Sequence, residues 1–148
     1  MSKNIRIPSG VTTSRSSEFN EIVRSIDDET LASAMADPMS RTVVLHAVFD
    51  EMPRRLIGDR VEGVDSVVCW RIGEPADMWT VVVANSRCTV HQGNPGLDPA
   101  VTLELGMVPF LRMIAGQMGG MALLVTGNLR IKGNMMTARN MEKWFVRD

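Results

Sequence analysis

Few side chains of this sequence have the types and spacing that metal binding or catalysis requires. Cys88 and His91 come nearest to a pair of metal ligands, but three residues apart on a strand they point to opposite faces of a sheet. Cys69 shares no ligand spacing with either residue. The sequence therefore predicts no metal site, and we expect no cofactor.

Neighbouring carboxylates, which general acid–base catalysis uses, occur at residues 27–29 and at Asp50 and Glu51. Neither group lies beside a nucleophile, so we interpret both as helix caps or solvated helix faces. Arg54 and Arg55 are interpreted in the same way, with the capture of a ligand carboxylate at a pocket mouth as the alternative. No residue is predicted to be catalytic.

The most distinctive segment, residues 99–134, is followed by a final helix and is rich in flexible apolar side chains. Seven of the chain's twelve methionines lie between Met107 and Met141. Methionine is unbranched and polarizable, so it adapts to irregular apolar space better than leucine or valine does. This composition favours an apolar binding pocket over a reaction centre, although a stripe of this kind also occurs in ordinary protein cores.

Composition limits the class of protein. A chain of 148 residues with 45% hydrophobic and 22% charged residues is typical of one globular domain. The net charge is −1 and basic residues are scattered along the sequence, so it shows no electrostatic footprint for nucleic acid or an anionic membrane. No run approaches the roughly 20 apolar residues of a membrane span, and the start does not read as a secretory signal. With two cysteines, we expect a cytoplasmic protein.

Residue patterns give the order of the elements. Residues 1–28 are predicted to form a flexible tail, and residues 29–148 the domain. Helices are expected from Asp27 to Met35 and from Ser40 to a kink at Pro53. Expected strands cover residues 64–72, 79–84, 87–92, 101–105 and 128–132. A helix from Pro109 to Gly116 and one after Asn134 complete an α+β fold, a mostly antiparallel sheet covered on one face by helices.

An ordered set of motifs carries a resemblance. It comprises Phe49-x-x-Met52-Pro53, Gly63-Val64-Asp65-Ser66-Val67-Val68, Trp79, Cys88-Thr89-Val90-His91-x-Gly93, Asp98-Pro99-x-Val101-Thr102-Leu103, Phe110-Leu111, Gly116 and Gly127-x-Leu129-x-Ile131-Lys132-Gly133-Asn134-Met135. Over residues 40–146 this set closely resembles a sterol carrier protein type 2 domain, in a bacterial single-domain form. The chain departs from the pattern at Leu124-Val125-Thr126 and at Gly119-Gly120, where changes would reshape a pocket.

The resemblance implies a five-stranded sheet with an apolar tunnel between the sheet and the helices. It also implies binding or transfer of a fatty acid, acyl thioester, sterol or terpene-like lipid without a chemical step. The expected ligand-binding residues are Phe110, Met113, Ile114, Met118, Met121, Leu124, Val125, Met135, Ala138, Met141 and Phe145. The expected partner is a hydrophobic small molecule, with a possible homodimer, no nucleic acid and no stable membrane insertion.

Two other functions stay open at this stage. An enzyme or enzyme accessory could use the same pocket for a hydrophobic metabolite, and His91, Cys69, Asp65 and Glu104 would then be the residues of interest. An interaction module could instead dock a partner helix, or a second copy of the chain, in an apolar groove.

Overall fold

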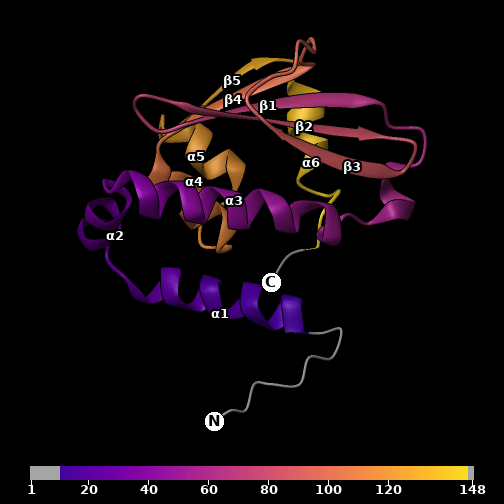
Figure 1. Ribbon diagram of the computed structural model, residues 1–148. Coiled ribbons are helices and arrows are strands. Elements are labelled where there is room, and N and C mark those ends of the chain that lie inside the picture. The colour runs from indigo at the N-terminus through magenta and orange to yellow at the C-terminus, as the bar shows by residue number, and fades with distance from the viewer. Residues whose placement is uncertain (1–10, 147–148) are drawn as a thin grey trace.

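The computed structural model describes residues 11–146, with side chains from residue 18 onward. One five-stranded sheet forms one layer, and the helices lie on one side of it (Figure 1). The strands are β1 (Ser66–Ile72), β2 (Asp77–Ala84), β3 (Arg87–Gln92), β4 (Val101–Leu105) and β5 (Leu129–Gly133). The helices are α1 (Val11–Ser25), α2 (Asp28–Met35), α3 (Pro38–Arg55), α4 (Met107–Ile114), α5 (Gly120–Val125) and α6 (Met135–Met141), with a 3-10 turn at Gly58–Val61. The predicted α+β class is confirmed.

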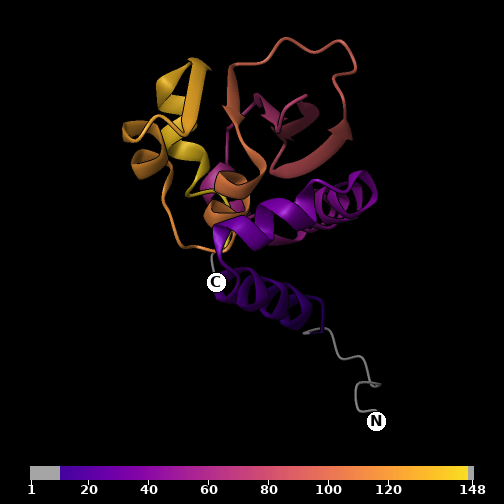
Figure 2. The ribbon, with the colours of Figure 1, turned by 90° about the vertical axis from the view of Figure 1, so that its left-hand side faces the viewer.

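The strand order is β3-β2-β1-β4-β5, and β1 with β4 is the parallel pair. The other three pairs are antiparallel, as the sequence predicts for most of the sheet. Because β4 lies on the far side of β1 from β3, residues 93–100 cross the sheet between them (Figure 2). Thr80 is buried and donates from its hydroxyl to the Gly93 carbonyl at 2.6 Å, which fixes the start of this crossing.

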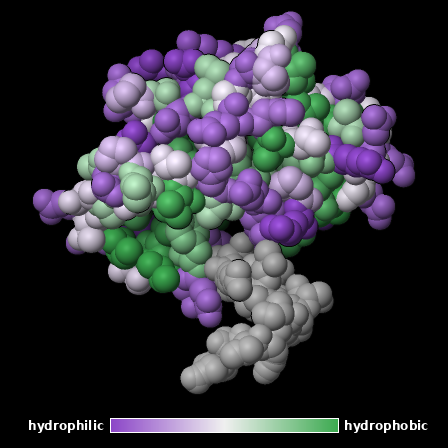
Figure 3. Space-filling model, viewed as in Figure 1, coloured by the Kyte–Doolittle hydropathy of each residue, from purple (hydrophilic) through white to green (hydrophobic). Residues whose placement is uncertain are grey.

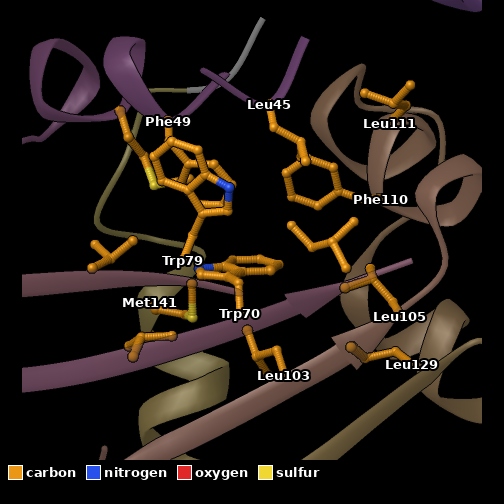
Figure 4. Packing of buried hydrophobic residues seen from close by; sticks show 14 of the residues in the cluster. Leu45, Phe49, Trp70, Trp79, Leu103, Leu105, Phe110, Leu111, Leu129 and Met141 are labelled. Atoms are coloured by element: carbon orange, nitrogen blue, oxygen red, sulfur yellow. The ribbon is translucent and has the colours of Figure 1, made fainter. Parts of the chain in front are cut away.

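One face of the sheet is apolar and packs against the helices. Every second residue of β1, β2 and β4 is buried there. At its centre the Phe49 ring stacks on the Trp79 ring, with centroids 4.7 Å apart, and on the Phe110 ring at 5.7 Å. Trp70 meets Phe110 edge-on at 5.5 Å (Figure 4). Aromatic contacts of this geometry join α3, α4 and the two central strands into one core.

The helix starts and ends explain two differences from the sequence prediction. Asp37, rather than Ser40, caps α3, because its carboxylate accepts from the Ser40 amide at 3.0 Å and Pro38 occupies the first turn. The sequence predicts that Pro53 interrupts this helix after Met52, whereas α3 continues to Arg55 with Pro53 inside it. Asp27 caps α2 and Asn134 caps α6, as their side-chain types predict.

Helix α1 occupies part of the region where the sequence predicts a flexible tail. Residues 1–10 lie outside the described structure, whereas α1 is held to α4 by Arg112. The buried Arg112 guanidinium donates to the carbonyls of Val23 and Ile26, both at 2.6 Å, and to the carboxylate of Asp28. It also reaches Gln117, so all of its nitrogens have partners. The domain boundary at residue 28 stays a prediction.

We expect Arg112→Met to lower the free energy of unfolding by about 3 kcal/mol, because it leaves the last carbonyls of α1 and the Asp28 carboxylate without their charged donor. Urea unfolding followed by tryptophan fluorescence measures this loss. Arg139→Met is the matched control on an exposed helix position, with an expected change within about 0.5 kcal/mol. Equal stability of the two variants would contradict the role of Arg112.

Candidate functional site

The predicted ligand-binding residues lie on α4, α5, α6 and their connections, next to β5 (Figure 2). They differ in exposure. Phe110, Ala138 and Met141 are buried in the core. Half-buried side chains at the margin of the core are Met113, Ile114, Met118, Leu124 and Phe145. Met121, Val125 and Met135 are exposed. The region therefore has a packed inner part and an accessible apolar margin.

Side chains from the sheet and from the helices pack against one another between the two layers. Phe49 and Phe110 are completely buried there, together with Leu111 and Leu123 (Figure 4 shows the first three). The buried Trp70 indole nitrogen has no hydrogen-bond acceptor among the described residues. An unsatisfied buried donor is costly, so this N–H is available to an oxygen atom of any guest that enters the layer.

A pocket of about 640 Å³ lies at the end of the apolar layer, open to solvent. Its apolar wall comes from α2, the end of β4 and the first turn of α4: Ala32, Met35, Ala36, Leu105, Met107, Val108 and Pro109. Its polar side chains are Arg41, Arg71, Glu74, Glu104, Asn128 and Arg130. Ligand pockets of proteins have volumes of roughly 300–1,000 Å³, so a small molecule of lipid size fits the space.

Ion pairs arrange the polar side of the pocket. The Glu104 carboxylate lies 3.4 Å from Arg71 and 3.2 Å from Lys132, on the sheet face opposite the core. Arg41 Nε lies 3.0 Å from Asp77, but without hydrogen-bond geometry, and this buried nitrogen has no hydrogen-bond partner among the described residues. Arg130 has no ion-pair partner in that part of the chain. Two of the three pocket arginines can thus donate to a polar ligand group.

Sequence reasoning missed this pocket. The sequence singled out Glu104 only for the enzymatic alternative and did not single out Arg71, because their meeting depends on the register of β1 with β4. The arginines considered instead, Arg54 and Arg55, pair with Glu51 on α3. The one available signal was that polar residues at the ends of two neighbouring strands can share an edge of the sheet.

The residues named for an enzymatic alternative do not form a catalytic group. Cys69 and His91 lie on the sheet face opposite the helices, with Thr80 between them in register, and Glu104 is held in its ion pairs. Burial raises the pKa of the Cys69 thiol, with Arg71 and Thr80 opposing the shift, which disfavours the nucleophilic thiolate. Asp65 precedes β1 and is exposed.

Cys88 and His91 face opposite sides of β3, as their spacing predicts: Cys88 is buried and His91 is exposed. In the described part of the chain, no three His, Cys, Asp or Glu side chains are grouped closely enough to hold a metal ion. Within the same residues, no helix combines the length and the apolar character needed to cross a membrane.

Comparison with known proteins identifies the fold. The model of the SCP-2 sterol transfer family matches residues 49–146. The chain belongs to this family. Sterol carrier protein 2 from Yarrowia lipolytica superposes with a TM-score of 0.51 at 22% identity, covering 58% of this chain and 70% of that one. The sec-alkylsulfatase Pisa1 from Pseudomonas sp. superposes with a TM-score of 0.61 at 18% identity, covering 69% of this chain and 16% of the sulfatase.

Curated relatives of this SCP-2 family member are longer proteins. Hydroxysteroid dehydrogenase-like protein 2 from Xenopus laevis is 25% identical over an alignment of 130 residues, and the match covers 78% of this chain and 31% of the relative. The human protein of the same name is 24% identical over 107 residues, 72% of this chain and 26% of the relative. The chain thus spans about a third or less of the length of these relatives.

Cys88 provides a test of the buried face of β3. Burial raises its pKa from the usual 9.0 to about 11, so the folded state keeps a proton that the unfolded state releases at lower pH. The resulting stabilisation is complete below about pH 9 and is lost as the pH rises towards 11. We expect the stability advantage of the wild type over Cys88→Ala to shrink between pH 8 and pH 10.5. Urea unfolding at the two pH values measures it, and an unchanged difference would contradict the shift.

Proposed function

We propose that the protein binds, and passes on, a hydrophobic small molecule with a polar end, such as a fatty acid, acyl thioester, sterol or terpene-like lipid. One observation carries this proposal: the 640 Å³ pocket has an apolar wall that continues into the core through Leu105 and Met107, and arginines on its other side. Membership of the SCP-2 sterol transfer family supports the same ligand class.

The two sides of the pocket would contact different parts of a ligand of this class. Met35, Met107 and Val108 would contact the apolar chain, since each methylene taken from water contributes about 0.8 kcal/mol. Arg41 and Arg130, whose donors are not all used, would bind the carboxylate, carbonyl or hydroxyl of its polar end. A site of this kind selects weakly among ligands, because most of the binding energy is not directional.

The residues predicted from the sequence remain part of the proposal as its inner section. Phe110 lies one turn along α4 from Met107, and Met113 and Ile114 follow at the margin of the core. A longer chain would reach them when the methionines of this region change rotamer, which their unbranched side chains permit. The indole N–H of Trp70 would then gain an acceptor from an oxygen-bearing guest.

A second proposal, an enzyme or enzyme accessory that acts on a hydrophobic metabolite in the same pocket, is favoured by the names of the longer relatives, a dehydrogenase-like protein and an alkylsulfatase. The dispersed positions of Cys69, His91 and Glu104 favour binding over catalysis by this chain itself. Incubating the purified protein with a secondary alkyl sulfate or a hydroxysteroid plus NAD separates the two. We expect no turnover, and product formation that saturates with substrate would overturn the purely binding role.

Titration with palmitate and with cholesterol tests the lead proposal. We expect saturable binding of one molecule of at least one of them, because the pocket has the volume and the mixed lining for a single lipid. Native mass spectrometry gives the stoichiometry, and tryptophan fluorescence gives the affinity. A folded protein that binds neither ligand would contradict the proposal.

Filling the pocket gives a more specific test. Ala32 is exposed on α2 and lines the pocket, so Ala32→Trp places a large ring in the space without touching the core. We expect at least tenfold weaker binding of the lipid that the wild type accepts. Ala34→Trp is the matched control, since Ala34 is exposed on the same helix away from the pocket lining. Equal affinities of both variants would place the ligand elsewhere.

A further inference from the structure

Exposed apolar side chains gather at two places on the described surface. The first group is on α1 and α3 and consists of Ile22, Met39 and Val43. Apolar surface over these helices is visible at the lower left of Figure 3. The second group is on α5 and α6 and consists of Met121, Val125, Met135 and Met136. Exposed large apolar groups of this kind commonly mark a surface that contacts another partner.

The two groups have surroundings of opposite charge. Residues 18–52, which contain the first group, have eight acidic side chains and two basic ones. Residues 113–146, which contain the second group, have four basic side chains and one acidic one, Glu142. The small net charge of the whole chain therefore conceals a separation of charge along the sequence, and the structure gives each half its own helices.

Glu142, the single acidic side chain of residues 113–146, is hydrogen-bonded within the protein. The Glu142 carboxylate accepts a hydrogen bond from the Gly120 amide at 3.0 Å, which joins the start of α5 to the end of α6. A Cβ atom at residue 120 would collide with this carboxylate and displace it from its present position. Arg139 and Lys143 are exposed and have no ion-pair partner within residues 18–146.

Helix α6 combines the basic and apolar groups on one side. Ala138 and Met141 are buried in the core, whereas Met136 and Arg139 are exposed three residues apart on α6, and Lys143 is exposed in the turn that follows the helix. On the adjoining α5, Met121 and Val125 are four residues apart and share the exposed side. Basic side chains beside exposed apolar ones are the composition that binds the surface of an anionic bilayer.

We propose that the exposed sides of α5 and α6 dock on an anionic lipid surface, with Met121, Val125 and Met136 entering the headgroup region and Arg139 and Lys143 contacting lipid phosphates. The charge separation selects this face over the one on α1 and α3, which an anionic surface repels. The docking is peripheral, since the described chain has no membrane-spanning helix. It goes beyond lipid binding in the pocket and does not require it.

Vesicle co-sedimentation tests the docking. Wild-type protein is mixed with vesicles of phosphatidylcholine containing 30% phosphatidylglycerol, or of phosphatidylcholine alone, in 0.1 M and 0.5 M salt. We expect binding to the anionic vesicles at least fivefold stronger than to the neutral ones, and largely lost at 0.5 M salt, where charges more than a few ångströms apart are screened.

The chain offers a closely matched pair of variants. Met121→Asp with Val125→Asp on α5 should reduce vesicle binding at least fivefold, and so should Arg139→Glu with Lys143→Glu. Met39→Asp with Val43→Asp changes the same residue types at the same spacing on α3, and should leave binding unchanged. All six positions are exposed, and circular dichroism confirms folding.

The outcomes separate this proposal from the pocket. Loss of vesicle binding in the variant with Arg139→Glu and Lys143→Glu, with unchanged palmitate binding, supports a docking face distinct from the ligand site. Three results would overturn the proposal. They are no vesicle binding by the wild type, equal binding to anionic and neutral vesicles, and an equal loss of vesicle binding in the α3 and α5 variants. A protein that docks but binds no palmitate would refute the pocket and leave the docking face intact.

Discussion

The parallel pairing of β1 with β4 is the constraint on which the site depends. Parallel strands end at the same edge of a sheet, so Arg71 and Ile72 at the end of β1 lie beside Glu104 and Leu105 at the end of β4. Chain that leaves this edge forms α4, whose first turn builds the apolar wall of the pocket. An antiparallel meander would send the end of β4 to the opposite edge, away from Arg71. The crossing at residues 93–100 is what makes the parallel arrangement possible.

Arg112 plays the corresponding part in the helical layer. Its guanidinium donates hydrogen bonds to the carbonyls of Val23 and Ile26 at the end of α1 and to the Asp28 carboxylate at the start of α2. One side chain of α4 thus holds the corner between α1 and α2. Placing a cation at a helix C-terminus also matches the helix dipole. Because α2 contributes Ala32, Met35 and Ala36 to the pocket, the wall facing α4 depends on this corner. A buried charge thus positions an apolar surface.

The fold was largely predictable from local patterns, and the site was not. The alternation of apolar and polar residues in β4 specifies a strand from a few adjacent residues. The turn at Asn85 and Ser86 specifies a hairpin in the same way, and both of these residues have positive φ. Arg112 looked like one polar residue in an apolar helix, because its partners Val23, Ile26 and Asp28 are 84 to 89 residues away. The helix expected to be interrupted at Pro53 continues to Arg55, because a proline in the last turn disturbs few helical hydrogen bonds. Long-range register and burial are absent from local sequence patterns.

Packing and the proposed lipid binding are compatible because the packed core and the pocket occupy adjoining regions. The stacked rings of Phe49, Trp79 and Phe110 give the domain a rigid core without any guest. Toward α5 and α6, flexible methionine side chains take the place of the aromatic rings. Met113 at the end of α4 and Met118 before α5 are both half-buried. A chain entering from the pocket would exchange contacts with methionines, at a cost of rotamer entropy, rather than break the aromatic stack. The division of apolar residues into aromatic centre and methionine margin therefore sets how far a ligand can penetrate.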